Sequence, residues 1–384
     1  MELQLKCRPN GKFNIMCLGD LHENVDTDSP LGKARAEDMA KLINTALDRL
    51  RPDLVVLMGD TCTDCTDNDP EVFRAVVTRV TQPMVARGIP FAFIMGNHEH
   101  DDHHEEMIVK TYESIPGCLI FNDDPSITGC LNYYLIVQRS DAESPAFNLW
   151  FLDSNNLCED EAISVYDWVH EDQIAWYERK AAELKALNGG KPLPAVLFQH
   201  IPVPEEYNAM RPMKPWELYQ SVKGHAHWST CRYVAKEGMM RGYLGEGPCA
   251  PCHNAGQFAS WKKTGDIRAA IFGHDHLNDF TCTVDGITMG QCKTAGFRCY
   301  TDGCQSSVRM VTLDENRPDK VETEVYRFKH EFGLKSKSLG PIQRRINDKQ
   351  SFVLNLAVRV AAGAAALTLG AVAASQIKKK ICEK

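Results

Sequence analysis

The sequence predicts an α/β fold, and three observations lead to this prediction. Apolar runs of strand length occur at residues 13–18, 53–58 and 91–95, and each ends in Gly followed by Asp or Asn. Apolar residues recur at helical spacing between these runs, at 33–50 and 70–87. This alternation of strand and helix implies parallel strands joined by right-handed crossovers.

The later part of the chain continues with strands and one long helix. Further strands are expected at 132–138, 149–152, 195–198 and 267–272, and after Asn278 the pattern changes to β segments at 280–288, 308–313 and 321–328. The helix is expected over 170–187, where Asn188-Gly189-Gly190 ends it. Residues 202–262 are rich in Pro, Gly and His with weak periodicity, which predicts an irregular excursion over a site.

The composition indicates one large folded region followed by a different tail. We expect a catalytic domain over 1–332, a polar linker over 333–351, a candidate transmembrane or apolar helix over 352–376 and a basic tail over 377–384. Asn355 and Arg359 interrupt the apolar stretch, and central arginine is costly in a membrane, so a helix that packs on protein remains the alternative.

The charge distribution and the cysteines limit the class of protein. The net charge is −8, but from Gln343 onward the chain has eight Lys or Arg and only two Asp or Glu, so the body is strongly acidic. An acidic body argues against nucleic-acid binding. The polar start, Met1 to Gly11, predicts no secretory signal peptide, and 15 cysteines without one fit a reduced compartment. We expect a cytoplasmic protein, with the tail as a candidate membrane anchor.

Polar clusters follow five of the predicted strands. Ligands bind beyond the carboxyl ends of strands in open α/β sheets, so loops from neighbouring strands should converge there. Imidazole, carboxylate and amide groups without thiolate suit divalent metals such as Fe, Mn or Zn. The clusters are Asp20-Leu21-His22, Gly59-Asp60, Gly96-Asn97-His98-Glu99, Gln199-His200 and Gly273-His274-Asp275-His276.

The order of these clusters resembles the calcineurin-like metallophosphoesterase superfamily. The stretches HIPVPEEY from His200 and GHDHLNDF from Gly273 are similar to its purple-acid-phosphatase-like branch, and the resemblance covers roughly Phe13 to Val311. It implies two β-sheets packed face to face and flanked by helices, a four-layer sandwich.

The resemblance also implies a site for two metal ions. One metal would be held by Asp20, His22, Asp60 and His276. The second would share Asp60 and add Asn97, His200 and His274. The family's catalytic histidine falls on His98.

The sequence differs from the purple acid phosphatases, called the purple enzymes below, at a residue connected with their colour. Their tyrosine ligand lies three residues after the Gly-Asp aspartate, and this chain has Thr63 there. His22 also stands where the purple enzymes have a different residue. We therefore expect no tyrosinate-to-iron colour.

The expected chemistry is phosphate ester hydrolysis. Two cations clamp the attacking and leaving oxygens and lower the pKa of bound water, so a metal-bound hydroxide would be the nucleophile. His98 would stabilise phosphoryl charge or protonate the leaving alkoxide. Glu99 and Asp275 are expected to orient ligand imidazoles. A phosphomonoesterase acting on a phosphorylated small molecule or protein is the main hypothesis. The alternatives are a phosphodiesterase, for instance on cyclic nucleotides, and a metal-bound scaffold without turnover.

Several other residues have less specific patterns. Cys249 and Cys252, followed by His253, match haem-attachment spacing, but ordinary reduced cysteines are the main interpretation and a metal or redox role the alternative. His100 is a candidate for substrate contact, although a solvated helix start is the simpler interpretation. We expect His225 and His227 to be loop residues, and Arg298 and Tyr300 are candidates to flank the substrate.

Overall fold

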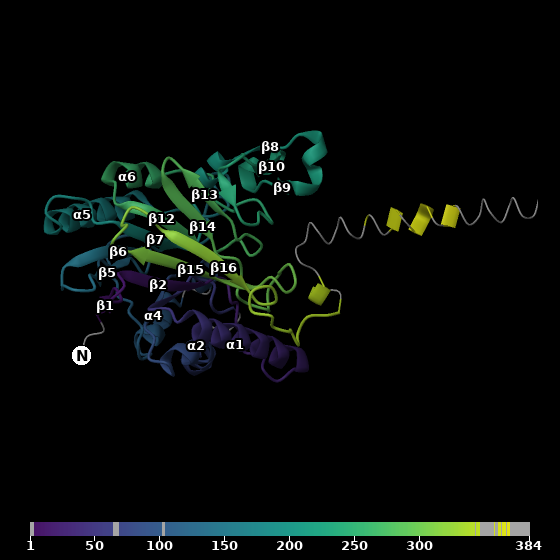
Figure 1. The fold of residues 1–384 in the computed structure, drawn as a ribbon, viewed down its shortest axis with the longest axis horizontal. Helices are drawn as coiled ribbons and strands as arrows, with labels where there is room; N and C mark the ends of the chain where they lie inside the picture. Colours follow the sequence, from purple (N-terminus) through teal and green to yellow (C-terminus); the bar gives the residue numbers. More distant parts are fainter. Residues whose placement is uncertain are drawn as a thin grey trace, which may run out of the picture.

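A computed structural model describes residues 4–63, 69–101, 104–341 and 343–345, with scattered positions between 357 and 368. Two large sheets lie between two helical layers (Figure 1). The mixed α/β sandwich expected from the sequence is therefore confirmed.

The first sheet has five strands and carries the amino-terminal part of the fold. Its central strands β2 (Lys12–Leu18), β3 (Leu54–Leu57) and β4 (Phe91–Phe93) run parallel, as the strand–helix alternation predicts. The antiparallel strands β15 (Ser307–Asp314) and β16 (Glu322–Arg327) complete the order β16-β15-β2-β3-β4.

The second sheet has eight strands in the order β1-β5-β6-β7-β12-β14-β13-β11. At its centre, β7 (Ala195–Gln199) lies between β6 (Pro145–Phe151) and β12 (Ile267–Phe272) and is parallel to both. The remaining strands are β1 (Leu5–Lys6), β5 (Tyr133–Gln138), β11 (Met240–Arg241), β13 (Thr281–Val284) and β14 (Ile287–Gln291).

Helices cover the outer face of each sheet (Figure 1). On the five-stranded sheet, α1 (Pro30–Leu50) begins where the Ser29 side chain accepts from the Gly32 N–H, and α2 (Pro70–Val85) is capped by Asp69. The short α3 (Asn97–His100) and α4 (Glu105–Glu113) follow β4. On the other sheet lie α5 (Glu171–Leu187) and α6 (Gln257–Thr264).

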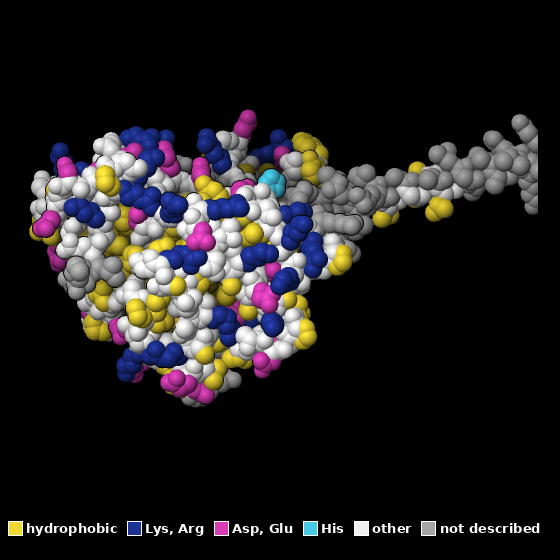
Figure 2. Space-filling view, turned by 60° about the horizontal axis from the view of Figure 1, so that its bottom comes forward, with side chains coloured by type: hydrophobic (Ala, Val, Ile, Leu, Met, Phe, Trp, Pro, Cys, Tyr) yellow, Lys and Arg dark blue, Asp and Glu magenta, His cyan; other side chains and the backbone are white. Residues whose placement is uncertain are grey.

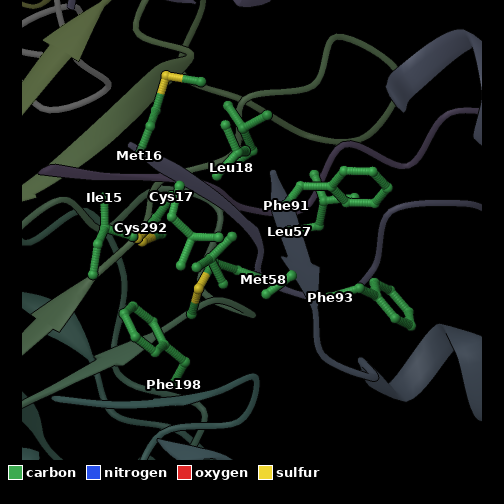
Figure 3. Close-up of a cluster of buried hydrophobic side chains, with 14 of the residues drawn as sticks. Ile15, Met16, Cys17, Leu18, Leu57, Met58, Phe91, Phe93, Phe198 and Cys292 are labelled. Carbon is green, nitrogen blue, oxygen red and sulfur yellow. The ribbon is translucent and has the colours of Figure 1, made fainter. Parts of the chain in front are cut away.

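The space between the two sheets is filled by apolar side chains. Ile15 and Cys17 of β2 are fully buried and lie near Phe198 of β7, while Phe91 and Phe93 belong to the same buried cluster (Figure 3). The strands here are apolar on both faces because each sheet also packs on helices. This packing fixes the two sheets, and hence their strand ends, relative to one another.

Residues 202–262 are more regular than the sequence predicts. Three short strands, β8 (Met210–Pro212), β10 (Arg232–Ala235) and β9 (Val222–Lys223), form a small antiparallel sheet. A short 3-10 helix, η1 (Pro204–Ala209), precedes β8, and two others, η2 (Pro215–Gln220) and η3 (Ala226–Thr230), lie between the strands. The strands are only two to four residues long, too short to show a period of two, so the prediction of an irregular segment was wrong there.

The start of the expected linker is attached to α1. The buried carboxylate of Asp38 accepts from the hydroxyls of Ser336 and Ser338, at 2.6 and 2.7 Å, and from the Lys337 N–H at 2.9 Å. Residues 336–338 therefore belong to the folded body. The short η4 (Gln343–Arg345) follows.

The candidate helix over 352–376 falls almost entirely outside the described residues, as does the basic tail over 377–384. A few positions inside it, such as 363–365, are helical. Among the residues that the structure describes, none of the helices combines the length and apolar character that crossing a bilayer requires. On the face in Figure 2, Lys and Arg side chains are spread over the body with Asp and Glu among them.

Candidate metal centre

The seven expected metal ligands come from loops at the carboxyl ends of strands in both sheets. Asp20 and His22 follow β2, Asp60 follows β3, and Asn97 follows β4. His200 directly follows β7 in the other sheet. His274 and His276 follow β12. All seven are buried, although up to 256 positions separate them in the sequence.

The backbone at these loops is unusual. Asp20, His22, Asp60 and His274 have positive φ values of 49°, 46°, 47° and 72°. Non-glycine residues rarely adopt this region, and such strain concentrates at functional sites. Gly59 has a φ of 84°, and a Cβ there would lie 2.7 Å from Nδ1 of His200. The tight turn at Gly59 therefore lets the two sheets' loops approach.

The first group of side chains consists of Asp20, His22, Asp60 and His276. One ligand atom from each lies within 4.8 Å of the others. The Nε2 atoms of His22 and His276 are 3.0 Å apart, and Nε2 of His276 lies 3.7 Å from Oδ1 of Asp20. This is the set that the family resemblance assigns to one metal.

The second group shares Asp60 with the first. Ligand atoms of Asp60, His200 and His274 lie within 4.8 Å of one another, with Nε2 of His200 3.2 Å from Oδ2 of Asp60. The backbone N–H of His98 donates to Oδ1 of Asp60 at 2.9 Å. This hydrogen bond places Asn97, the residue before His98, beside the second group. Asp60 is therefore positioned to bridge two ions.

Several ligand atoms have no hydrogen-bond partner among the described residues although they are buried. They are Oδ2 of Asp20, Oδ1 of Asn97 and the Nε2 atoms of His200 and His274. The 3.2 Å contact of His200 with Asp60 lacks hydrogen-bond geometry. Buried polar atoms without partners are costly, and a metal ion would satisfy them. The residues therefore fit a pair of cations.

The other ring nitrogens of three ligand histidines are already engaged. Nδ1 of His200 donates to the carbonyl of Met58 at 2.7 Å, and Nδ1 of His276 lies 3.2 Å from the carbonyl of Tyr300. Nδ1 of His22 contacts the hydroxyl of Thr63 at 2.6 Å. Such contacts orient the rings, so that their Nε2 atoms would be available to hold metals.

The match to known proteins agrees with this geometry. The family model described as calcineurin-like phosphoesterase matches residues 13–278. The chain belongs to the calcineurin-like phosphoesterase family.

Relatives of this phosphoesterase-family chain occur in plants and yeast. It is 25% identical over 345 residues to "Probable inactive purple acid phosphatase 29" of Arabidopsis thaliana, covering 83% of this chain and 80% of the relative. It is 27% identical to "Phosphatase DCR2" of Saccharomyces cerevisiae, covering 76% of this chain and 48% of that protein. Among solved structures, a dimetal phosphatase from Danio rerio is similar with a TM-score of 0.48 and 12% identity, covering 82% of this chain and 99% of that one.

The protonation of two histidines in the phosphoesterase-family site favours metal binding. Burial lowers the pKa of His274 well below its ordinary value, and burial with repulsion from His22 lowers the pKa of His276 to about 3. Both imidazoles are therefore neutral, as metal ligands must be. Burial would raise the pKa of Asp60, but His200, His22 and His98 outweigh it and hold that pKa well below its usual range.

His98 lies at the edge of the centre with its side chain 39% exposed. Its Nε2 is 4.0 Å from Oδ2 of Asp60, and its Nδ1 is 2.6 Å from Oδ2 of Asp101. Burial alone would lower the pKa of His98, but the carboxylates of Asp60 and Asp101 raise it above its ordinary value. The raised pKa favours the protonated form of the His98 ring, which reaches solvent beside the candidate metal ligands.

Glu99 and Asp275 do not orient imidazoles, contrary to the sequence-based expectation. The Glu99 carboxylate accepts from the N–H groups of Asp60 and Thr61, both at 2.7 Å. The Asp275 carboxylate accepts from the Cys249 N–H at 3.1 Å. Burial raises the pKa of Glu99 to about 7 and that of Asp275 to about 8. Both side chains hold loop backbone, because the glycine-rich turns leave N–H groups that need acceptors.

His100 and Arg298 are engaged in ion pairs with carboxylates. Nε2 of His100 lies 3.0 Å from Oδ1 of the buried Asp153. The Arg298 side chain is only 4% exposed and its guanidinium lies 2.5 Å from Glu23. Both residues brace the structure in buried ion pairs.

The remaining candidates lie outside the ligand groups. His225 immediately precedes η3, in agreement with the expected loop position, and its ring lies 5.6 Å from that of Tyr166. His227 lies within this short 3-10 helix, where a loop was expected. Cys249 and Cys252 are among the 13 described cysteines, none of which is joined to another by a disulfide. Their N–H groups donate to Asp275 and Ser164, which shows a structural use of this segment.

Sequence patterns missed two side chains near the ligands, Tyr166 and Cys299. The Tyr166 ring packs edge-on against His274 at 4.4 Å, and the Cys299 thiol lies with His22 and His276. Cys299 follows β14 and Tyr166 follows β6, but no spacing motif marks these two positions, so only the fold reveals them. Tyr300, a candidate from the sequence, stacks on His276 at 4.1 Å.

Proposed function

We propose that this chain is a dinuclear-metal-dependent phosphoric ester hydrolase that acts as a phosphomonoesterase. The observation that carries this proposal is the convergence of buried, unpartnered ligand atoms around Asp60, with Oδ2 of Asp20 on one side and the Nε2 atoms of His200 and His274 on the other. When bound, two ions of Fe, Mn or Zn would polarise a phosphoryl oxygen and make water more acidic.

The protein's own groups supply orientation and a proton. Tyr300 and Met58 carbonyls fix the His276 and His200 rings, so the ligand atoms are positioned before any metal arrives. His98 is partly exposed beside Asp60, and its raised pKa favours a proton on its ring. We assign to it the stabilisation of phosphoryl charge and protonation of the leaving alkoxide.

The substrate class in this proposal is a phosphorylated small molecule or protein. The tyrosine rings beside His274 and His276 favour a substrate whose ester group can lie against an aromatic side chain. A phosphodiesterase and a metal-bound scaffold remain the rival functions, and the word "inactive" in the names of plant relatives supports testing the scaffold directly.

The test is hydrolysis of para-nitrophenyl phosphate and of its bis-ester by the full chain, with Mn, Fe or Zn supplied in turn. We expect metal-dependent release from the monoester, at a higher kcat/KM than from the bis-ester, and loss of both activities in Asp60→Asn. Preference for the bis-ester would establish the phosphodiesterase instead. A protein that binds two metals but hydrolyses neither ester would be the scaffold.

A further inference from the structure

The thiol of Cys299 is close to the first ligand group. Its Sγ lies within 4.8 Å of a ring nitrogen of His22 and of His276, whose own Nε2 atoms are 3.0 Å apart. The residue is exposed to solvent, so a proton leaving the thiol can pass to water. None of the five polar clusters identified in the sequence contains a cysteine.

Contacts on both sides of Cys299 fix its position. The next residue, Tyr300, stacks on the His276 ring at 4.1 Å with an interplanar angle of 9°, and its carbonyl lies 3.2 Å from Nδ1 of His276. The preceding residue, Arg298, is buried and bonds Glu23 and the carbonyl of Asp26. The thiol therefore has little freedom to leave the ligand group.

The group that contains Asp20, His22 and His276 provides a separate observation: one of its buried oxygens lacks a hydrogen-bond partner. Oδ2 of Asp20 is completely buried and has no hydrogen-bond partner among the described residues. It belongs with His22 and His276 to the group that would hold one ion. The Cys299 sulfur is grouped with the two imidazoles and not with the carboxylates, so a cation on the imidazole side of this group would be within its reach.

We propose that Cys299 is a further ligand to the metal held by Asp20, His22, Asp60 and His276; this rests on the dinuclear site of the proposed function. On binding, the S–H proton goes to solvent and the thiolate forms the bond to the metal. A thiolate is softer than imidazole or carboxylate, so it favours Zn or Fe over Mn at this position. The two ions would then differ in chemistry, because Asp60, Asn97, His200 and His274 supply only nitrogen and oxygen.

The test uses cobalt(II), whose bond to thiolate gives a charge-transfer absorption band in the near ultraviolet. The full chain is titrated with cobalt and the bound metal is counted. Cys299→Ser is compared with Cys231→Ser, a matched change at another exposed cysteine, which lies beside Thr230 rather than the ligand histidines. We expect the band in the wild type and in Cys231→Ser, and its loss in Cys299→Ser.

Metal affinity provides a second measurement. Cys299→Ser should weaken one of the two cobalt sites by about tenfold or more, since even the loss of an outer contact to a ligand has such an effect. If the wild type bound two cobalt ions without showing the band, or if the band persisted in Cys299→Ser, Cys299 would not be a ligand. The dinuclear site itself would stand in either case. A wild-type chain that binds no cobalt would contradict the dinuclear site as well.

Discussion

The carboxylate of Glu99 accepts a hydrogen bond from the backbone N–H of Asp60, with an N···O distance of 2.7 Å. The same carboxylate accepts from the N–H groups of Thr61 and Gly96, at 2.7 and 2.8 Å. One buried side chain after β4 thus holds the loop after β3, and with it the carboxylate shared by both ligand groups. The position of Asp60 therefore depends on a residue outside both ligand groups.

Glu99→Gln should weaken metal binding and lower stability together. An amide keeps one acceptor oxygen but turns an NH2 group toward backbone N–H donors, which costs about 1–3 kcal/mol for a buried group left unsatisfied. Urea unfolding and metal content of the purified protein measure the two effects. Glu113→Gln, at the end of α4, is the control and should change neither. Wild-type stability and metal content in Glu99→Gln would contradict the bracing role.

Asp60→Asn should remove most of the bound metal. Asp60 belongs to both groups, and a neutral amide cannot bridge two cations as a carboxylate does. We expect metal content to fall from two ions to fewer than one, measured by elemental analysis after dialysis. Asp48→Asn, a change at an exposed carboxylate paired with Arg87, should leave metal content unaltered. Two retained ions in Asp60→Asn would rule out the bridging position.

His98→Ala should lose turnover while keeping its metals. The ring supplies a proton and positive charge beside Asp60 but belongs to neither ligand group. Loss of a general acid lowers kcat by about 10²- to 10⁴-fold. Hydrolysis of para-nitrophenyl phosphate and metal content are measured on the same sample, with His330→Ala, a change at a largely exposed histidine, as the control. A kcat within twofold of the wild type would exclude His98 from the chemistry.

The His100–Asp153 pair should make stability depend on pH in a predictable direction. Burial alone lowers the pKa of His100, but the Asp153 carboxylate outweighs it and raises that pKa far above the ordinary value of 6.5. A histidine with a raised folded-state pKa contributes stability that is complete below the unfolded-state pKa and is lost as pH rises toward the folded-state pKa.

The stability difference between wild type and His100→Gln should therefore be largest near pH 6 and shrink toward pH 9. The slope approaches about 1.4 kcal/mol per pH unit, the linkage limit for one proton. Urea unfolding at four pH values measures it, and His330→Gln, at an exposed position, should show no such trend. A difference that grew with pH would show that His100 is neutral in the folded state.

The sequence by itself predicted the main strands and helices of the two large layers and the candidate ligand set. Apolar runs in the sequence predict buried strands. The strands β2, β3 and β4 lie where those runs predict, and each is followed by its polar cluster. Asp20, Asp60 and His200 could be selected because strand ends converge at one edge, a rule that needs no coordinates. Five ordered clusters also carried the family resemblance.

Only the tertiary structure decided which side chains surround that set. Glu99 and Asp275 bind backbone, and Cys299 reaches His22 and His276, because the packing of two sheets brings separate loops together. Sequence spacing reports on neighbours along one strand or helix, but a contact between loops depends on how the sheets pack. That packing is the sum of many apolar contacts, and no local pattern encodes it.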